Sequence, residues 1–204
     1  MRIFAIGRNY AEHIEELKNE RPTEPVIFTK PDTAVIRKNA PFYYPDISKD
    51  IHFEVELVLR VCKEGKSIEP SFANKYFDSI GIGIDFTARD LQQKAKEKGL
   101  PWDIAKGFNG SAPISDTFLP VGHFSDLKNI NFKLEVDGKV RQEGNTSMML
   151  FDFSYIISYL SRFFTLKTGD LIFTGTPKNV GAVAIGNRLS GYIENEKLLE
   201  FEVK

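Results

Sequence analysis

Residues 51–59 alternate apolar and polar side chains over most of their length. Such alternation predicts a β-strand, because successive side chains on a strand point to opposite faces. His52, Glu54 and Glu56 then share one face, and carboxylates two residues apart lie about 6.7 Å apart. A hard divalent cation would relieve their mutual repulsion, although an edge strand with one solvated polar face is the plainer alternative.

A third acid follows the next predicted strand. Residues 80–85 form an apolar run that contains two glycines and ends on Asp85. Glycines inside a strand often mark the close approach of backbone or ligand. Residues 86–92 are typical of a helix start, so Asp85 or Thr87 could simply cap that helix. Alternatively, Asp85 joins Glu54 and Glu56 in a three-carboxylate site.

Other polar residues are placed where they could support chemistry. His13 and Glu16 lie three apart on a predicted helix at 11–18, so the glutamate could orient the imidazole as a base. A solvated amphipathic helix explains the same pattern. Arg89 and Gln92 share a helix face near Asp85 and could hold a substrate carboxylate, or they could be ordinary surface residues.

The remaining pattern favours an α+β fold dominated by β-structure. Residues 131–136 and 140–142 flank Asp137-Gly138 and predict a β-hairpin. Asp152 is expected to cap a helix that runs to Phe164, and a strand at 171–173 leads into a turn at 174–177. That turn could offer backbone N–H groups and hydroxyls to an anion, or be a plain β-turn. The segment from 187 to 203 predicts two further strands.

Composition narrows the class of protein. A chain of 204 residues is most simply one domain, and 42% hydrophobic residues suffice for a core. A net charge of −1 gives no electrostatic reason to bind nucleic acid or an anionic membrane. The single cysteine, Cys62, fits a reducing compartment. With no secretory signal pattern and no long apolar run, we expect a cytoplasmic protein without membrane spans.

Four segments, in this order, resemble the fumarylacetoacetate hydrolase family. They are His52-Phe53-Glu54-Val55-Glu56, Gly83-Ile84-Asp85-Phe86-Thr87-Ala88-Arg89-Asp90-Leu91-Gln92, Lys106-Gly107-Phe108 and Gly169-Asp170-Leu171-Ile172-Phe173-Thr174-Gly175-Thr176-Pro177. The resemblance runs from about Gly7 to Gly191. It is strongest to the short single-domain members, which are acylpyruvases and oxaloacetate decarboxylases or tautomerases.

The resemblance implies a fold and a site. The fold is the β-rich roll of the family's C-terminal domain, with residues 1–204 as one catalytic domain, residues 8–25 as a mobile lid, and a homodimer as the assembly. Glu54, Glu56 and Asp85 would bind Mg²⁺ or Mn²⁺, and His13 and Glu16 would form a catalytic dyad. Lys106 would stabilise an enolate, while Arg89, Gln92 and Thr176 would bind the substrate.

Two details of the resemblance concern the lysines. Lys30, which precedes Pro31, is expected to be a structural or rim residue. Family members commonly carry Asp where this chain has Asn109, and a hydroxyl where it has Gly110. The resemblance therefore does not identify the residues that support Lys106.

The implied activity is metal-dependent C–C hydrolysis of small acylpyruvate-type β-diketo acids. Oxaloacetate decarboxylation or tautomerisation, and isomerisation of the 2-hydroxyhepta-2,4-diene-1,7-dioate type, need the same electron sink and are the alternatives. A more remote alternative is a non-catalytic β-domain that binds a cation. In the enzymatic readings the partner is a small keto acid.

Overall fold

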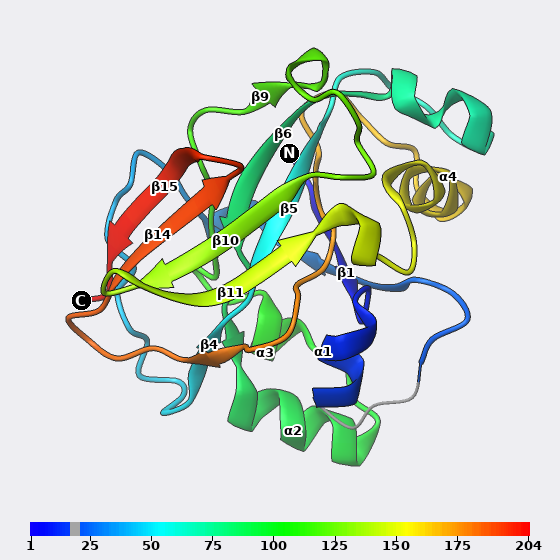
Figure 1. Ribbon diagram of the computed structural model, residues 1–204. Coiled ribbons are helices and arrows are strands. Elements are labelled where there is room, and N and C mark those ends of the chain that lie inside the picture. The colour runs from blue at the N-terminus through cyan, green and yellow to red at the C-terminus, as the bar shows by residue number, and fades with distance from the viewer. Residues whose placement is uncertain (17–20) are drawn as a thin grey trace.

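The computed structural model describes residues 1–16 and 21–204, excluding the side chains of His13 and Glu15. Its largest unit is a six-stranded mixed sheet in the order β2-β1-β12-β5-β6-β9 (Figure 1). Strands β1 and β12 run parallel, and the other neighbours are antiparallel. The strands are β1 (Ile3–Gly7), β2 (Val26–Lys30), β5 (Val55–Val61), β6 (Phe77–Ile84), β9 (Leu119–Pro120) and β12 (Leu171–Phe173).

Three smaller sheets complete the β-structure. An antiparallel sheet, β11-β10-β14-β15, contains the predicted hairpin. Asp137 and Gly138 both have positive φ, which the tight turn between these strands requires. The strands are β10 (Asn131–Val136), β11 (Lys139–Asn145), β14 (Arg188–Ile193) and β15 (Glu196–Glu202). The other two sheets are β13-β4-β7, with β4 (Ile51–Phe53), β7 (Thr87–Ala88) and β13 (Gly181–Ala182), and β3-β8, with β3 (Val35–Ile36) and β8 (Ala112–Pro113).

The main core lies between the six-stranded and four-stranded sheets. Leu57 and Ile82 from the former join Leu134 and Leu189 from the latter in one buried cluster. A second, smaller cluster on the other face includes Val58 and Phe173. Burial of apolar surface on both faces of the central sheet explains why apolar residues of β5 and β6 occur on both faces of these strands.

Glycines in β6 let neighbouring side chains approach the strand closely. A Cβ at Gly83 would lie 2.8 Å from the Phe173 ring, and one at Gly81 would lie 2.7 Å from the Ser115 hydroxyl. Both distances are too short for real contacts. These glycines do mark close approaches, but the approaching groups are side chains of the chain itself and not the backbone or ligand that the sequence predicted.

Four α-helices border the sheets in the described part of the chain. Helices α1 (Ala11–Glu16), α2 (Arg89–Lys98) and α3 (Asp103–Lys106) lie together at one end of the six-stranded sheet (Figure 1). Helix α4 (Phe153–Phe163) is capped as predicted, because Asp152 accepts a hydrogen bond from the backbone N–H of Tyr155 at 2.9 Å. Short 3₁₀ turns occur at Asp32–Ala34, Pro70–Lys75, Val121–His123 and Thr146–Met148.

The predicted strand over residues 51–59 is wrong in one respect, because it is two strands. Strand β4 ends at Phe53 and β5 begins at Val55, and they belong to different sheets. The chain changes sheets at Glu54, whose carbonyl accepts a hydrogen bond from Asp85 N–H at 2.8 Å. The alternation therefore does not mark a solvated face, since Glu54 and Glu56 are both buried.

This topology brings distant segments to one edge of the large sheet. Because β1 and β12 are parallel, and β5 and β6 are antiparallel to their neighbours, four strand ends meet there. They are the ends of β1, β6 and β12 and the start of β5, next to α2 and α3. The fold class is thus the expected α+β roll, with 37% strand and 22% helix.

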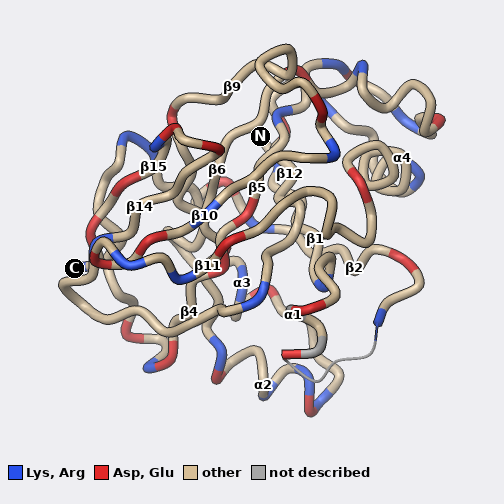
Figure 2. Tube along the Cα trace, in the orientation of Figure 1, with Lys and Arg blue, Asp and Glu red and all other residues tan. Residues whose placement is uncertain are grey.

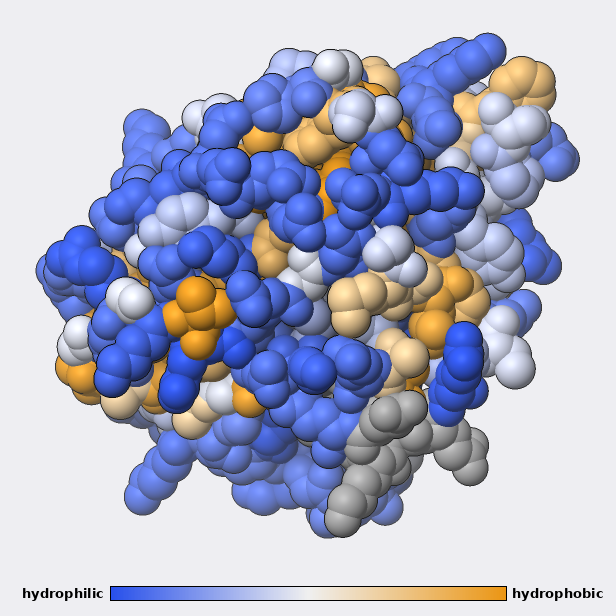
Figure 3. All heavy atoms as spheres, viewed as in Figure 1, coloured by the Kyte–Doolittle hydropathy of each residue, from blue (hydrophilic) through white to orange (hydrophobic). Residues whose placement is uncertain are grey.

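The surface carries charges of both signs. Lys and Arg are intermixed with Asp and Glu along the trace in Figure 2. The face shown in Figure 3 is mainly hydrophilic, with small separated apolar patches. Within residues 1–16 and 21–204, no helix has the length and apolar character needed to cross a bilayer.

Candidate functional site

Three carboxylates converge where β5 starts and β6 ends. Glu54, Glu56 and Asp85 each offer an oxygen within 4.8 Å of the oxygens of the other two. Their exposed fractions are 5%, 2% and 0%. The sequence prediction that β5 and the end of β6 bring these acids together is confirmed as geometry, and the cluster provides the hard oxygen donors that Mg²⁺ and Mn²⁺ prefer.

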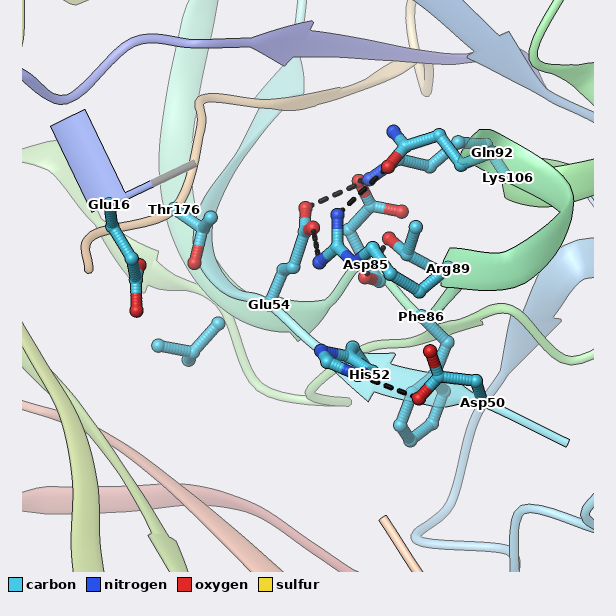
Figure 4. A network of polar contacts seen from close by, with 12 residues as sticks. Glu16, Asp50, His52, Glu54, Asp85, Phe86, Arg89, Gln92, Lys106 and Thr176 are labelled. Atoms are coloured by element: carbon cyan, nitrogen blue, oxygen red, sulfur yellow. Dashed lines mark hydrogen bonds and ion pairs between the residues drawn. The ribbon is translucent and has the colours of Figure 1, made fainter. Parts of the chain in front are cut away.

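Two cations from α2 and α3 hold this cluster from one side (Figure 4). The ammonium group of Lys106 lies 2.8 Å from Glu54 Oε2 and 2.6 Å from Asp85 Oδ2. A guanidinium nitrogen of Arg89 lies 2.6 Å from Glu54 Oε1. The short helix α3 therefore places Lys106 in the site, which no reasoning from the residues alone could have done.

Lys30 is a third cation that the sequence interpretation undervalued. Its side chain is fully buried, and its ammonium lies 2.7 Å from Asp85 Oδ1 as an ion pair. The same nitrogen donates to the carbonyl oxygen of Lys106 and to the hydroxyl of Ser111, the latter at 3.1 Å. Lys30 is thus a buried structural residue that contacts the carboxylate cluster, and not a rim residue. Its position at the end of β2 did not indicate this burial in the sequence.

Ser111 supports Lys106, although Asn109 and Gly110 differ from the residues that family members commonly carry at these positions. The Ser111 hydroxyl donates to the carbonyl oxygen of Lys106 at 2.8 Å and is fully buried. Gly110 itself has φ of +77°, a conformation that suits glycine. The hydroxyl next to the site is therefore supplied one position later than the resemblance suggests.

The turn after β12 binds a group of the protein itself. The backbone N–H of Gly175 donates to Glu56 Oε2 at 2.7 Å. Gly175 has φ of +100°, and a Cβ there would lie 2.6 Å from the Cβ of Asn9, so only glycine fits. The predicted anion partner of this turn is thus the Glu56 carboxylate, at least for this N–H group.

The electrostatics of the cluster fit a cation. Burial raises the pKa of Glu56 well above its ordinary value, and the charges of Asp85 and Glu54 raise it further. Lys106 and the Gly175 N–H oppose that rise without cancelling it. Since the pKa of a buried carboxyl falls when a cation binds, these residues suit a divalent ion as their shared partner.

The two buried lysines differ in how their charges are stabilised. Burial lowers the pKa of Lys106, but the carboxylates of Asp85 and Glu54 outweigh burial and the net pKa is raised. For Lys30, burial outweighs the attraction of Asp85, and the net pKa is lowered. Lys106 contacts two carboxylates and Lys30 contacts one, which accounts for the opposite directions.

The alternative that Asp85 or Thr87 caps the helix is wrong. Helix α2 begins at Arg89, its N-cap is Ala88, and no side chain caps it. Residues 87–88 form β7, which pairs with β4 and so separates Asp85 from the helix start. The Asp85 carboxylate is directed to the lysines instead.

The expected substrate-binding residues line a cavity that lies against the carboxylate cluster. Gln92 Oε1 accepts from Arg89 at 2.9 Å, and the hydroxyl of Thr176 accepts from Gln142 at 2.9 Å. Arg89 Nε is buried and has no partner among the described residues. Gln142, which the sequence gave no reason to select, also accepts from Val55 N–H at 2.9 Å and so ties β5 to the turn after β12.

The predicted dyad is only partly described. The side chain of His13 and residues 17–20 lie outside the described residues, and so does part of the expected lid at 8–25. Glu16 is exposed, and its two carboxylate oxygens accept from Asn179 N–H at 3.0 and 3.1 Å. Figure 4 draws Glu16 and Thr176 on the opposite side of Glu54 from Lys106.

The segment before α1 is well anchored. Asn9 is fully buried, and its amide nitrogen donates to the carbonyl oxygen of Thr174 at 2.7 Å. Tyr10 and Ile14 are buried at 1% and 3% exposure. Packing and hydrogen bonds therefore hold these three positions of the expected lid at 8–25.

A small cavity of about 30 Å³ lies against the cluster. Besides the predicted site residues, its wall contains Arg8, Lys96 and Trp102, which the sequence analysis did not select as site residues. Larger hollows of about 540 and 630 Å³ lie elsewhere, and none of their described lining residues is a buried carboxylate or lysine. The carboxylate cluster therefore lines the small cavity and neither of these two hollows.

The fold places three buried carboxylates together in a site that could hold a divalent metal. The chain belongs to the fumarylacetoacetate hydrolase family, since residues 2–204 match the profile "Fumarylacetoacetate (FAA) hydrolase C-terminal". Its relatives are named enzymes, and this chain is accordingly an enzyme of that family.

Three relatives are informative. The chain is 40% identical to "Oxaloacetate tautomerase FAHD1, mitochondrial" of Bos taurus, covering 99% of this chain and 91% of that protein. It is 44% identical to "Oxaloacetate decarboxylase, mitochondrial" of Dictyostelium discoideum, covering 91% and 85%. The crystal structure of fumarylpyruvate hydrolase from Pseudomonas aeruginosa in complex with Mn²⁺ and pyruvate superposes with a TM-score of 0.93 at 37% identity, covering 100% and 89%.

The expectation of a cytoplasmic location is wrong by this comparison, because the curated relatives from Bos taurus and Dictyostelium discoideum are named mitochondrial. The reasoning failed for a physical reason. A low cysteine count indicates a reducing environment, and it does not discriminate between reducing compartments.

Proposed function

We propose that this protein acts on oxaloacetate, as a tautomerase that interconverts its enol and keto forms and as a decarboxylase. The buried Glu54, Glu56 and Asp85 cluster, closed on one side by Lys106 and Arg89, carries the proposal. The names of the relatives from Bos taurus and Dictyostelium discoideum support oxaloacetate as the substrate. The main expectation from the sequence, acylpyruvate hydrolysis, has weaker support than this alternative.

We further propose that Glu54, Glu56 and Asp85 hold one Mg²⁺ or Mn²⁺. The Mn²⁺ in the fumarylpyruvate hydrolase structure supports a metal of this kind. When bound, such an ion would supply Lewis-acid polarisation of the oxygens of a 2-keto acid. Burial and the charges of Asp85 and Glu54 raise the pKa of Glu56, and a bound cation would lower it.

The cations of the site would hold the substrate and its developing charge. Arg89 has a buried Nε–H without a partner among the described residues, which suits a substrate carboxylate oxygen. Gln92 fixes the Arg89 guanidinium from one side, and Thr176 offers a hydroxyl from the other side of the cavity. Lys106 has a raised pKa and therefore stays protonated, so it would stabilise an enolate oxygen and not act as a base.

The two reactions share one electron sink. In tautomerisation the enol loses its O–H proton and C3 gains a proton. In decarboxylation the electrons of the C3–C4 bond move toward the C2 oxygen, CO₂ leaves, and C3 of the resulting enolate is protonated to give pyruvate. Both pass through negative charge on the C2 oxygen, which a buried ammonium group such as Lys106 can stabilise.

We assign the proton transfer at C3 to His13, oriented by Glu16, since the family resemblance implies that these two residues form a catalytic dyad. The Glu16 carboxylate is held by the backbone N–H of Asn179, and Glu12 on the same helix pairs with Lys178 at 3.1 Å. These contacts tie α1 to the loop that follows Thr176. We also retain residues 8–25 as the proposed lid of this single catalytic domain.

A homodimer remains our proposal for the assembly. Several large apolar side chains are exposed near α4, namely Tyr155 at 40%, Phe163 at 56%, Phe72 at 52% and Leu100 at 54%. Exposed apolar surface of this kind is common at protein interfaces. Light scattering on the purified protein measures the assembly directly, and a monomer at all concentrations would contradict the proposal.

The function is tested by three assays on one preparation with saturating Mg²⁺ or Mn²⁺. Loss of enol absorbance reports tautomerisation, pyruvate formation reports decarboxylation, and acetylpyruvate cleavage reports hydrolysis. We expect metal-dependent turnover of oxaloacetate that exceeds acetylpyruvate cleavage. Faster acetylpyruvate cleavage, or oxaloacetate turnover that does not depend on metal, would overturn the proposal.

A further inference from the structure

The wall of the cavity carries two cations that have no acidic partner among the described residues. Arg8 and Lys96 both line the cavity, and neither forms an ion pair with a carboxylate of the described residues. The other three cations of the site, Lys30, Lys106 and Arg89, are each within 2.8 Å of a carboxylate oxygen. The two groups of cations are thus held in different ways.

The conformation of Arg8 indicates a special position. It follows β1 directly and has φ of +59°, a backbone region that arginine rarely adopts. The next residue, Asn9, is fully buried and bonded to Thr174 and Phe151. These hydrogen bonds fix the backbone next to Arg8 and direct Arg8 toward the cavity that it lines.

Lys96 is placed on the same cavity by α2 and by an aromatic ring. It lies seven residues after Arg89, which is two helical turns, so both residues lie on the side of α2 that faces the cavity. Its ammonium is 5.7 Å from the centre of the Trp102 ring. Burial and the neighbouring positive charges of Arg89 and Arg8 lower the pKa of Lys96, which agrees with two cations sharing one small space.

The balance of charge calls for an anionic ligand with more than one charge. Among the described residues of the site, the formal charges of the three carboxylates balance those of Lys30, Lys106 and Arg89, and Arg8 and Lys96 add two further positive charges. A divalent ion at the carboxylates would increase that excess. A keto acid with one carboxylate would satisfy only part of it.

We propose that Arg8 and Lys96 form a subsite for the distal carboxylate of the substrate, and that they select dicarboxylic keto acids over monocarboxylic ones of the same length. This inference rests on the proposed function, because it assumes that the keto-acid end of the substrate lies at the carboxylate cluster. It identifies Arg8 and Lys96 as specificity-determining residues.

Trp102 allows binding to be measured without catalysis. It is the single tryptophan of the chain and lines the same cavity. Its fluorescence would be recorded by stopped flow, before turnover, in the Mn²⁺-loaded protein. The two ligands are oxaloacetate and 2-oxobutyrate, which differ only in that a methyl group replaces the distal carboxylate.

We expect the parent protein to bind oxaloacetate at least about tenfold more tightly than 2-oxobutyrate, as a charge-assisted contact requires. Lys96→Gln and Arg8→Asn should each weaken oxaloacetate binding about tenfold and leave 2-oxobutyrate unchanged. Asparagine is chosen for position 8 because it tolerates positive φ. Lys98→Gln, an exposed change of equal charge on the same helix, is the control and should alter neither ligand.

Equal affinities for the two ligands in the parent, or parallel losses for both ligands in Lys96→Gln, would overturn the subsite. If Arg8→Asn fails to fold, Lys96→Gln decides alone, since its position on α2 is half-buried. A protein that binds oxaloacetate selectively but does not turn it over would refute the proposed function and leave the subsite standing. A protein that turns over oxaloacetate with unselective binding would do the reverse.

Discussion

The two sides of the cavity differ in whether their charged side chains are paired with opposite charges of the protein. On the inner side, Glu54 and Asp85 are each within 2.8 Å of a cation, and Glu54, Asp85 and Lys106 are buried. On the outer side, Arg8 and Lys96 are half-buried and have no carboxylate partner among the described residues. On the inner side, opposite charges of the protein pair with one another. On the outer side, the charges are available to a ligand.

The difference shows where this fold fixes geometry and where it leaves freedom. A buried charge without a partner is costly, so the inner groups must be mutually satisfied for the chain to fold around them. A half-exposed cation keeps part of its hydration. It can therefore stand where it would bind a ligand without a large loss of protein stability. Changes on the inner side should therefore affect folding, metal and rate together, and changes on the outer side should affect selectivity.

The largest effect is expected from removing one inner carboxylate. Glu56→Gln retains the shape of the side chain but removes its charge, so the metal should no longer bind and turnover of oxaloacetate should fall to the uncatalysed level. Calorimetric titration with Mn²⁺ and the pyruvate-formation assay measure the two outcomes. If the variant binds Mn²⁺ as tightly as the parent does, Glu56 is not a ligand.

The next prediction tests whether α1 takes part in chemistry. His13→Ala should slow enol-to-keto conversion by about 10²–10⁴-fold if His13 is the general acid–base group, because C3 then loses its proton donor. Decarboxylation should fall much less, since CO₂ leaves without a base and Lys106 is retained. Both rates are measured on the same preparation at saturating metal, and equal losses would mean that His13 shapes the site without transferring the proton.

Much of this site was predictable because its residues lie close in sequence to strong local patterns. Glu54, Glu56 and Asp85 stand next to apolar strands, and antiparallel pairing of β5 with β6 brings the start of one to the end of the other. The hairpin turn at Asp137 and Gly138 and the cap at Asp152 were likewise local signals. These elements form for reasons that lie within a few residues of each position.

What could not be predicted depends on contacts between distant segments. The break at Glu54 exists because its two flanking strands join different sheets, and alternation alone cannot reveal that. Lys30 reaches Asp85 across 55 positions of sequence, and Arg8 reaches the cavity only because Asn9 is anchored to Thr174. No periodicity records such packing, so only a family resemblance or a structure can find these residues.

The pH dependence of the inner cluster is a smaller effect with a defined sign. The folded pKa of Glu56 lies above its ordinary value of 4.5, so in the metal-free protein its stabilising contribution is complete below about pH 4.5. That contribution is lost as the pH rises through the folded pKa. Metal binding displaces the proton, so affinity for Mn²⁺ should rise up to about tenfold per pH unit within this window.

Denaturant unfolding at several pH values, without metal, isolates this term. The parent should lose free energy of unfolding across the window, relative to Glu56→Gln, which cannot ionise at this position. Parallel pH profiles for the two proteins would show that the Glu56 pKa is not raised in the folded state.

The smallest expected effect concerns the hydrogen bonds that Ser111 makes near Lys106 and Lys30. A matched pair of serine variants tests it. Ser111 donates to the carbonyl oxygen of Lys106 and accepts from Lys30, whereas Ser115 accepts from Ile82 N–H at 3.1 Å. Both are fully buried, so Ser111→Ala and Ser115→Ala should each cost about 1 kcal/mol in the free energy of unfolding. Only Ser111→Ala should also lower turnover, by a few-fold, because only Ser111 holds the backbone that carries Lys106. Thermal unfolding and the oxaloacetate assay separate the two outcomes, and an equal loss of turnover in both variants would mean that the inner side responds to general stability and not to the Ser111 contact.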